Sequence, residues 1–176
     1  MRTANLQLQT DPLAELAERH AAGVFRYLRS LVGDGETARD LLQDTFLRLQ
    51  PHAAEAGTGL VFTAARTCAL DHLRRRKTHV AVVTPMDGQT LEMVAASSAH
   101  QPDRAVEDRE LRSDLLEALA ALPEDQRSVF HLSEIEGLSY DEIATILSVS
   151  PGTIASRKHH AVRKLREDLR RRGHGA

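Results

Sequence analysis

The chain has 176 residues, of which 41% are hydrophobic and 27% charged, and its formal net charge is −2, a composition that excludes a disordered chain. No apolar run approaches the roughly 20 residues that cross a bilayer, and no basic segment followed by an apolar core opens the sequence, so neither a membrane helix nor a secretory signal is expected. The single cysteine, Cys68, excludes an intramolecular disulfide, and the common glycine-rich phosphate-binding motifs are absent, so we expect a cytoplasmic protein.

Three amphipathic helices are predicted in the first part of the chain. Residues 11–32 carry apolar side chains at the three- and four-residue spacing of one helix face, and residues 33–35 interrupt that pattern with two glycines. A second helix is expected at 36–50, followed by a loop at 51–59 and a third helix at 60–77. The expected core residues of the first two helices are Leu13, Leu16, His20, Val24, Leu28, Leu31, Leu41, Leu42, Thr45, Phe46 and Leu49.

Residues 78–105 differ from both neighbouring segments, because they contain Pro, Gly and Ser residues and show no clean helical period. A stretch of this length without its own structure is uncommon inside a compact domain. We therefore expect an all-α protein of two small helical domains, at 1–77 and 106–176, joined by a flexible linker at 78–105. The helices of the second domain are expected to bury Leu111, Leu115, Leu119, Leu122, Val129, Leu132 and Ile135.

Charge is distributed unevenly along the chain. Residues 79–122 hold three arginines against eight acidic residues, whereas residues 150–176 hold eight basic residues against two acidic ones. A second basic run, Arg74 to Lys77, ends the third predicted helix. Two basic segments separated by an acidic one indicate a protein that contacts a polyanion at two places. Basic helix ends that complement the helix dipole give the same pattern, so charge alone leaves both interpretations open.

Residues 138–165 predict a helix-turn-helix. Ser139 with Glu142 three residues later makes a capping box for a first helix. A connection of about three residues leads to Ser150, which is expected to cap a second helix with Pro151 at its first position. Two short helices joined in this way, with a basic second helix, are typical of DNA-binding proteins.

The second helix of this motif has two distinct faces. At about 100° per residue, Ile154, Ala161 and Leu165 share one side with Lys158, which is expected to extend toward water or phosphate. The other side carries small, hydrogen-bonding and cationic groups that suit a major groove. A helical hairpin with a solvated outer face is the alternative, and the caps, the turn and the charge favour DNA binding. The outer residues are Thr153, Ser156, Arg157, His159, His160 and Arg163.

The adjacent histidines of this helix do not indicate a metal site. Neighbouring helical residues point about 100° apart, and no third ligand follows at a suitable spacing. We therefore predict no metal and no other cofactor.

A second polar surface is predicted on the helix at 36–50. Asp40, Gln43, Asp44 and Leu47 have the spacing i, i+3, i+4 and i+7, so they share the face that points away from the core. Two carboxylates, an amide and an exposed leucine are suited to docking on a basic partner. Periodicity alone favours an ordinary solvated face, and nothing around the aspartates suggests a catalytic pocket.

Three segments, in order, resemble a known family. They are ARDLLQDTFLRL at 38–49, ARTCALDHLRRR at 65–76 and LPEDQRSVFHLSEIEGLSYDEIATILSVSPGTIASR at 122–157. They are similar to the regions shared by extracytoplasmic-function (group IV) RNA polymerase sigma factors. The resemblance covers about 11–77 and 107–170, which is nearly everything except the expected linker.

The resemblance implies a role for each surface. The docking residues for the clamp helices of the polymerase β′ subunit would be Asp40, Gln43, Asp44 and Leu47. The −10 promoter element would be captured and melted by the loop 51–59 and the helix 60–77, with contacts from Arg66, Thr67, Arg74, Arg75, Arg76 and Lys77. The −35 element would be read by Thr153, Ser156, Arg157, His159, His160 and Arg163. The second domain would also meet the β flap, while the linker threads toward the active centre.

We therefore predict an alternative sigma factor that binds core RNA polymerase and promoter DNA and is held inactive by an anti-sigma factor. It is not expected to be an enzyme or to have a small-molecule substrate. Two alternatives remain: a stand-alone helix-turn-helix regulator that binds an operator as a dimer, and a helical adaptor that binds only proteins. The first requires tight operator binding without polymerase, and the second requires no promoter-specific binding.

Overall fold

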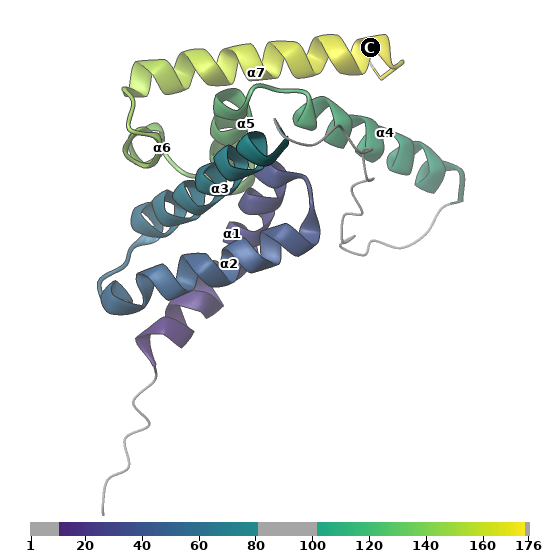
Figure 1. Ribbon diagram of the computed structural model, residues 1–176. Helices are drawn as coiled ribbons and strands as arrows, with labels where there is room; N and C mark the ends of the chain where they lie inside the picture. Colours follow the sequence, from purple (N-terminus) through teal and green to yellow (C-terminus); the bar gives the residue numbers. More distant parts are fainter. Residues whose placement is uncertain (1–10, 81–101, 175–176) are drawn as a thin grey trace, which may run out of the picture.

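The computed structural model describes residues 11–80 and 102–174, and both segments are helical apart from short turns and caps. No strand occurs in these two segments, and the all-α prediction is confirmed. Figure 1 shows α7 lying across the top of the molecule, above α5, with α1 to α3 below it. None of the described helices is long and apolar enough to span a membrane.

In residues 11–80, side-chain caps and a glycine set where the first helices begin and end. The long helices of this segment pack on one another. Asp11 and Asp34 cap the first two helices by accepting hydrogen bonds from backbone N–H groups two and three residues later. Gly33 ends the first helix with φ of 81°, a left-handed conformation that glycine adopts without strain. The helices are α1 (Pro12–Val32), α2 (Gly35–Leu49), the 3-10 turn η1 (Gln50–His52) and α3 (Thr58–Val80).

The second segment contains the predicted helix-turn-helix. Glu142 and Ser139 form the capping box, since each side chain accepts the backbone N–H of the other residue. Ser148 ends the first helix of the motif with φ of 55°, and Ser150 caps the second. The elements are α4 (Pro102–Ala120), α5 (Glu124–Phe130), the π-helical turn η2 (His131–Ile135), α6 (Tyr140–Leu147) and α7 (Pro151–Arg171).

The structure corrects the sequence prediction in two places. α3 continues to Val80 and α4 begins at Pro102, so both edges of the expected linker at 78–105 are helical, and residues 81–101 lie outside the described part. Leu111 and Ile135, which were expected to be buried, are 41% and 45% exposed. Leu111 lies at the middle of α4, ahead of the apolar cluster that holds α4 to α7, and Ile135 lies at the end of the π turn.

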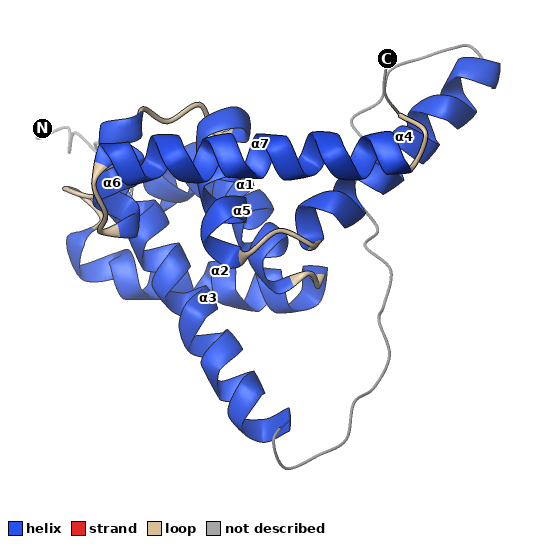
Figure 2. Ribbon diagram, turned by 90° about the horizontal axis from the view of Figure 1, so that it is seen from above, coloured by secondary structure: helices blue, strands red, loops and turns tan. Residues whose placement is uncertain are grey.

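We call α1–α3 the N-terminal domain and α4–α7 the C-terminal domain. A single apolar core runs through both, because buried residues of α1 to α3 cluster with those of α5, η2, α6 and the start of α7. α3 packs on α6, and α1 packs on α5 (Figure 2). The contributions from the C-terminal domain are Val129, Leu132, Ile143, Ala144, Ile146, Leu147 and Ile154. The two domains are therefore in direct contact in this structure.

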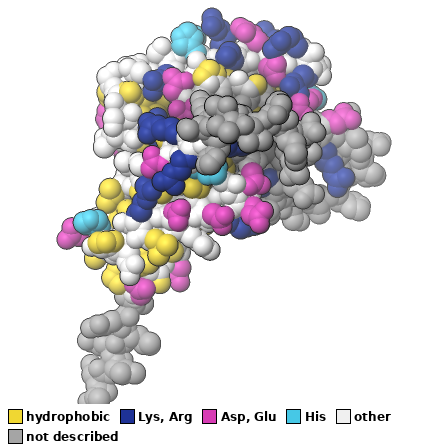
Figure 3. All heavy atoms as spheres, viewed as in Figure 1, with side chains coloured by type: hydrophobic (Ala, Val, Ile, Leu, Met, Phe, Trp, Pro, Cys, Tyr) yellow, Lys and Arg dark blue, Asp and Glu magenta, His cyan; other side chains and the backbone are white. Residues whose placement is uncertain are grey.

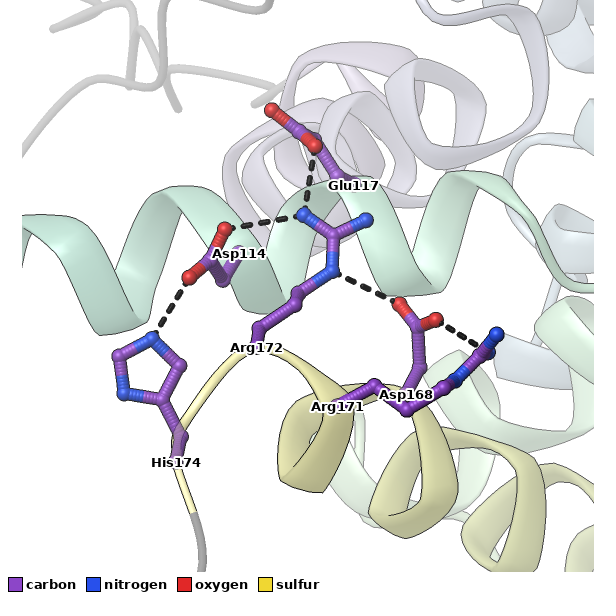
Figure 4. A network of polar contacts seen from close by, with 6 residues as sticks. All are labelled: Asp114, Glu117, Asp168, Arg171, Arg172 and His174. Carbon is purple, nitrogen blue, oxygen red and sulfur yellow. Dashed lines mark hydrogen bonds and ion pairs between the residues drawn. The ribbon is translucent and has the colours of Figure 1, made fainter.

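α4 is held to the end of α7 by a charged network and a small apolar cluster (Figure 4). The Arg172 guanidinium lies 2.9 Å from Asp114, 2.6 Å from Glu117 and 3.0 Å from Asp168. His174 lies 2.6 Å from the second oxygen of Asp114. These side chains are partly exposed, so the network is screened by solvent and salt. The apolar cluster beneath it consists of Ala118, Leu122, Ala161 and Leu165.

The shared core predicts a large difference between two leucine truncations. Leu28 is fully buried, so Leu28→Ala should lower the free energy of unfolding by about 2–5 kcal/mol. Leu47 is 63% exposed, so Leu47→Ala serves as the control and should change it by less than about 0.5 kcal/mol. Urea unfolding followed by circular dichroism measures both. Equal losses in the two variants would contradict the assigned burial.

The capping box of α6 predicts a dependence of stability on pH. Hydrogen bonds from the Ser139 side chain and backbone lower the pKa of Glu142 below its ordinary value of 4.5. The stabilisation is therefore present above that value and is lost as the pH falls through the lowered pKa. Glu142→Ala should melt earlier than wild type near neutral pH, and the difference should disappear in acid. Asp141→Ala, which changes the neighbouring carboxylate, is the control, and a difference that is constant with pH would contradict the prediction.

Candidate nucleic-acid interface

The outer face of α7 is open to solvent. The helical period correctly predicted the buried side of α7, which carries Ile154, Ala161 and Leu165. The opposite side of the helix therefore faces solvent. Thr153 is half-buried, and its hydroxyl lies 2.9 Å from the Ser150 hydroxyl, so this residue supports the cap. The exposed residues of the predicted face are Ser156, His159, His160 and Arg163. Arg163 also lies 3.9 Å from Glu167 on the same helix, and both of these side chains remain well exposed.

The two histidines of this face pack on each other. The ring centroids of His159 and His160 are 5.8 Å apart, and the rings are inclined at 73°. Within residues 11–80 and 102–174, no group of three or more His, Cys, Asp or Glu side chains is placed to hold a metal ion.

The cationic groups beside this face are already paired. The Arg157 Nε lies 3.0 Å from Asp125 of α5, and the Arg157 side chain is only 27% exposed. Lys158 pairs with Glu134 and lies over the Tyr140 ring. The hydrogen bond to Glu134 raises the pKa of Lys158. The Lys158 ammonium therefore extends to a carboxylate at the solvent-exposed edge of the same domain, and the side chain stays 27% exposed.

Some cationic side chains of the predicted −10 surface on α3 are also held in ion pairs. Arg66 lies 3.5 Å from Glu124 of α5 and is 23% exposed, whereas Thr67 is exposed and donates its hydroxyl hydrogen bond to the Thr63 carbonyl. Arg74, Arg75 and Arg76 are exposed, and Arg74 also pairs with Asp71. The side chain of Lys77 lies outside the described residues. Figure 3 shows basic and acidic side chains interspersed on one face of the molecule.

Two adjacent acidic residues, which the sequence analysis did not single out, connect the two predicted DNA surfaces. Glu124 and Asp125 open α5, and neighbouring residues of a helix point about 100° apart. One carboxylate therefore reaches Arg66 of the N-terminal domain and the other reaches Arg157 of α7. In the sequence this pair resembles the usual acidic first turn of a helix, so no local signal distinguished it.

The acidic face of α2 is fully available. Asp40, Gln43, Asp44 and Leu47 are all exposed, while the opposite side of α2 packs against α1 and α3. The two aspartates form no ion pair with any residue that the structure describes, and Leu47 is 63% exposed. An exposed leucine at the end of a row of polar and acidic side chains is suited to a protein partner.

Two family descriptions match the chain. Residues 16–79 match Sigma-70 region 2, and residues 112–165 match Sigma-70, region 4. Among similar curated proteins, RNA polymerase sigma factor CarQ of Myxococcus xanthus is 37% identical over 164 residues, which cover 90% of each chain. ECF RNA polymerase sigma factor SigL of Mycobacterium tuberculosis is 34% identical over 164 residues, covering 90% of this chain and 89% of that protein.

Solved structures share the fold. The sigma factor RpoE from Bartonella quintana, in complex with the anti-sigma factor NepR, superposes with a TM-score of 0.74 at 23% identity, over 89% of this chain and 96% of that one. CnrH, in complex with the cytosolic domain of CnrY, gives a TM-score of 0.59 at 20% identity, over 87% and 84% of the two chains. From the family matches and the sequence relatives, the chain belongs to the extracytoplasmic-function RNA polymerase sigma factors.

Proposed function

We propose that this sigma factor docks on core RNA polymerase through the acidic face of α2 and reads promoter DNA with α3 and α7. The observation that carries the proposal is the presence of regions 2 and 4 in one chain, with both the α2 face and the outer face of α7 exposed. Polymerase binding brings promoter specificity to an enzyme that otherwise lacks it. The chain thereby directs initiation at a set of promoters.

The α2 surface supports docking through two kinds of contact. Asp40 and Asp44 offer exposed carboxylates that form no ion pair with the residues described by the structure, and these carboxylates complement basic side chains on the polymerase clamp helices. Leu47 offers an apolar anchor beside them. Gln43 adds hydrogen-bonding capacity in the same row. The expected partner surfaces are the β′ clamp helices for this face and the β flap for the C-terminal domain.

The DNA surfaces support recognition of two separate elements. On α7, Ser156, His159, His160 and Arg163 form the exposed part of the −35 face, and Arg157 joins it once released from Asp125. On α3, Thr67 and the exposed arginines 74–76 form the −10 surface, and Arg66 joins it once released from Glu124. A net charge of −2 provides little non-specific attraction to DNA, so polymerase must supply much of the affinity.

Catalysis and regulation follow from the same assignment. Phosphodiester chemistry belongs to the polymerase, so this chain acts as a specificity factor rather than an enzyme, and it works in the cytoplasm where the chromosome is transcribed.

The structural neighbours RpoE and CnrH were each solved in complex with another protein, which for RpoE is an anti-sigma factor. We infer that an anti-sigma factor also controls this chain.

The docking proposal predicts loss of polymerase binding in Asp40→Ala/Asp44→Ala. Removing both carboxylates should abolish co-elution with core polymerase on a sizing column, because the charge complementarity of the face is lost. Glu15→Ala/Glu18→Ala, on the exposed side of α1, is the matched control and should co-elute like wild type. Co-elution of the α2 variant at the wild-type level would contradict the docking role, and tight operator binding without polymerase would favour a stand-alone regulator.

The −35 proposal predicts a position-dependent effect along α7. Arg163→Ala should reduce transcription from promoters selected with the reconstituted holoenzyme by about tenfold, since one charged contact to DNA contributes about 1–3 kcal/mol. Arg170→Ala, about 10 Å farther along the helix, should have a much smaller effect. In vitro transcription with each holoenzyme measures the ratio. Equal losses in both variants would indicate general charge attraction instead of recognition by this face.

A further inference from the structure

Two adjacent histidines lie on the outer face of α7. His159 and His160 are both exposed, and their ring centroids are 5.8 Å apart. Within the described residues, neither ring takes part in a hydrogen bond or an ion pair. Histidine is the side chain whose charge ordinarily changes between pH 5 and 8. The charge of this face can therefore change near neutral pH.

Few fixed charges accompany the two rings on this face. Arg157 is held by Asp125, and Lys158 is held by Glu134. Arg163, one turn beyond the histidines, is 59% exposed. Among the exposed residues of the predicted face, Arg163 is the only one that is positive at every pH, because a guanidinium does not lose its proton in proteins. Each proton taken up by the histidines therefore adds a large fraction of the positive charge that faces DNA.

The charged groups around the two rings leave room for an anion. α7 packs on α4, α5 and α6, and these elements place no described carboxylate within ion-pairing distance of either ring. On α7 itself, the charged residues three or four positions away are Arg157, Arg163 and Lys164, all of which are cations. Carboxylates of the neighbouring elements that pair with α7 hold other side chains, namely Asp125 with Arg157, Glu134 with Lys158, and Asp114 and Glu117 with Arg172, while Asp141 and Glu142 open α6.

The position of the histidines along α7 favours a phosphate over a base edge as that anion. In helix-turn-helix proteins the N-terminal residues of the second helix contact the base edges in the major groove. His159 and His160 follow Pro151 by eight and nine residues, which is about 12–14 Å along the helix at 1.5 Å per residue. The major groove is about 12 Å wide, so side chains at this distance lie near its rim, where the backbone phosphates are.

We propose that His159 and His160 form a protonatable phosphate-binding pair, which takes up a proton when α7 binds −35 DNA. This inference rests on the proposed function, because it assigns a ligand and a pH dependence to the −35 face. One proton is sufficient, since two protonated rings 5.8 Å apart would repel each other. Because a phosphate binds the protonated pair more tightly than the neutral pair, DNA binding and proton uptake favour each other. Promoter affinity therefore rises as the pH falls from 8 to 6.

The test measures promoter binding by the reconstituted holoenzyme at pH 6 and pH 8, using fluorescence anisotropy at several salt concentrations. His159→Gln/His160→Gln keeps hydrogen-bonding groups on the face but cannot be protonated. The affinity of wild type relative to this variant should be about tenfold greater at pH 6 than at pH 8, as for one hydrogen bond to a charged group. Comparison within one polymerase preparation cancels the titration of polymerase itself. His20→Gln on α1 is the matched control and should behave like wild type at both pH values.

The salt dependence reports the phosphate contact directly. For wild type at pH 6, the slope of log affinity against log salt should be steeper than for the glutamine variant by about 0.9, the value for one additional phosphate, and the two slopes should agree at pH 8. His159→Arg/His160→Arg is charged at both pH values, so it should bind at pH 8 with the affinity and slope that wild type shows at pH 6. On a −35 element with one substituted base pair, the glutamine variant should lose the same factor as on the intact element.

Each outcome decides a separate point. A wild-type to glutamine affinity ratio that is equal at pH 6 and pH 8 would overturn the proposal. A loss confined to the intact −35 element would assign the two histidines to base reading and refute the phosphate contact. Wild-type holoenzyme that binds no promoter at either pH would refute the proposed function and this inference with it, a failure that is distinguishable because it precedes any change to the histidines.

Discussion

The burial of Tyr27 between the two domains is the constraint on which the rest of this structure depends. Its ring packs edge-on against Phe62 of α3 and lies 5.5 Å from the His131 ring of η2. Burial raises the pKa of the Tyr27 hydroxyl well above its usual value, so the group remains a hydrogen-bond donor to Ser128. A buried phenol without a partner would be costly, and α5 is therefore fixed against α1. That placement sets the positions of η2, Glu136 and the helix-turn-helix.

Charge pairing follows from this placement. With α5 fixed, its first turn lies between α3 and α7, and Glu124 and Asp125 neutralise one arginine on each side. DNA phosphates would have to compete with these carboxylates for Arg66 and Arg157. The low net charge acts in the same direction, because it limits attraction to DNA at long range. Both features agree with a factor whose affinity for promoters depends on polymerase.

Local signals were sufficient to predict most of the fold. Helical periods, caps and breakers placed the helices within a few residues, because those features act within one turn of the chain. The exposed α2 face and the outer side of α7 follow from the same periods, and the family resemblance then supplied their expected roles. Periodicity misplaced Leu111 and Ile135, because it identifies an apolar face without showing whether another element covers it. It also ended the third helix at Lys77, whereas α3 continues for three more residues to Val80.

The sequence by itself determined the all-α class, the helix-turn-helix and the family, since these depend on short-range spacing and on motifs that lie within contiguous segments. Only the tertiary structure decided which cations are free. Arg66 and Arg157 looked equivalent to their exposed neighbours, but each meets a carboxylate from α5, 58 and 32 residues away in the chain. The close approach of Gly23 and Glu136 was also invisible, because a Cβ on Gly23 would lie 2.5 Å from a carboxylate oxygen that belongs to the other domain. Contacts between residues this far apart in the chain are set by packing, which no local pattern encodes.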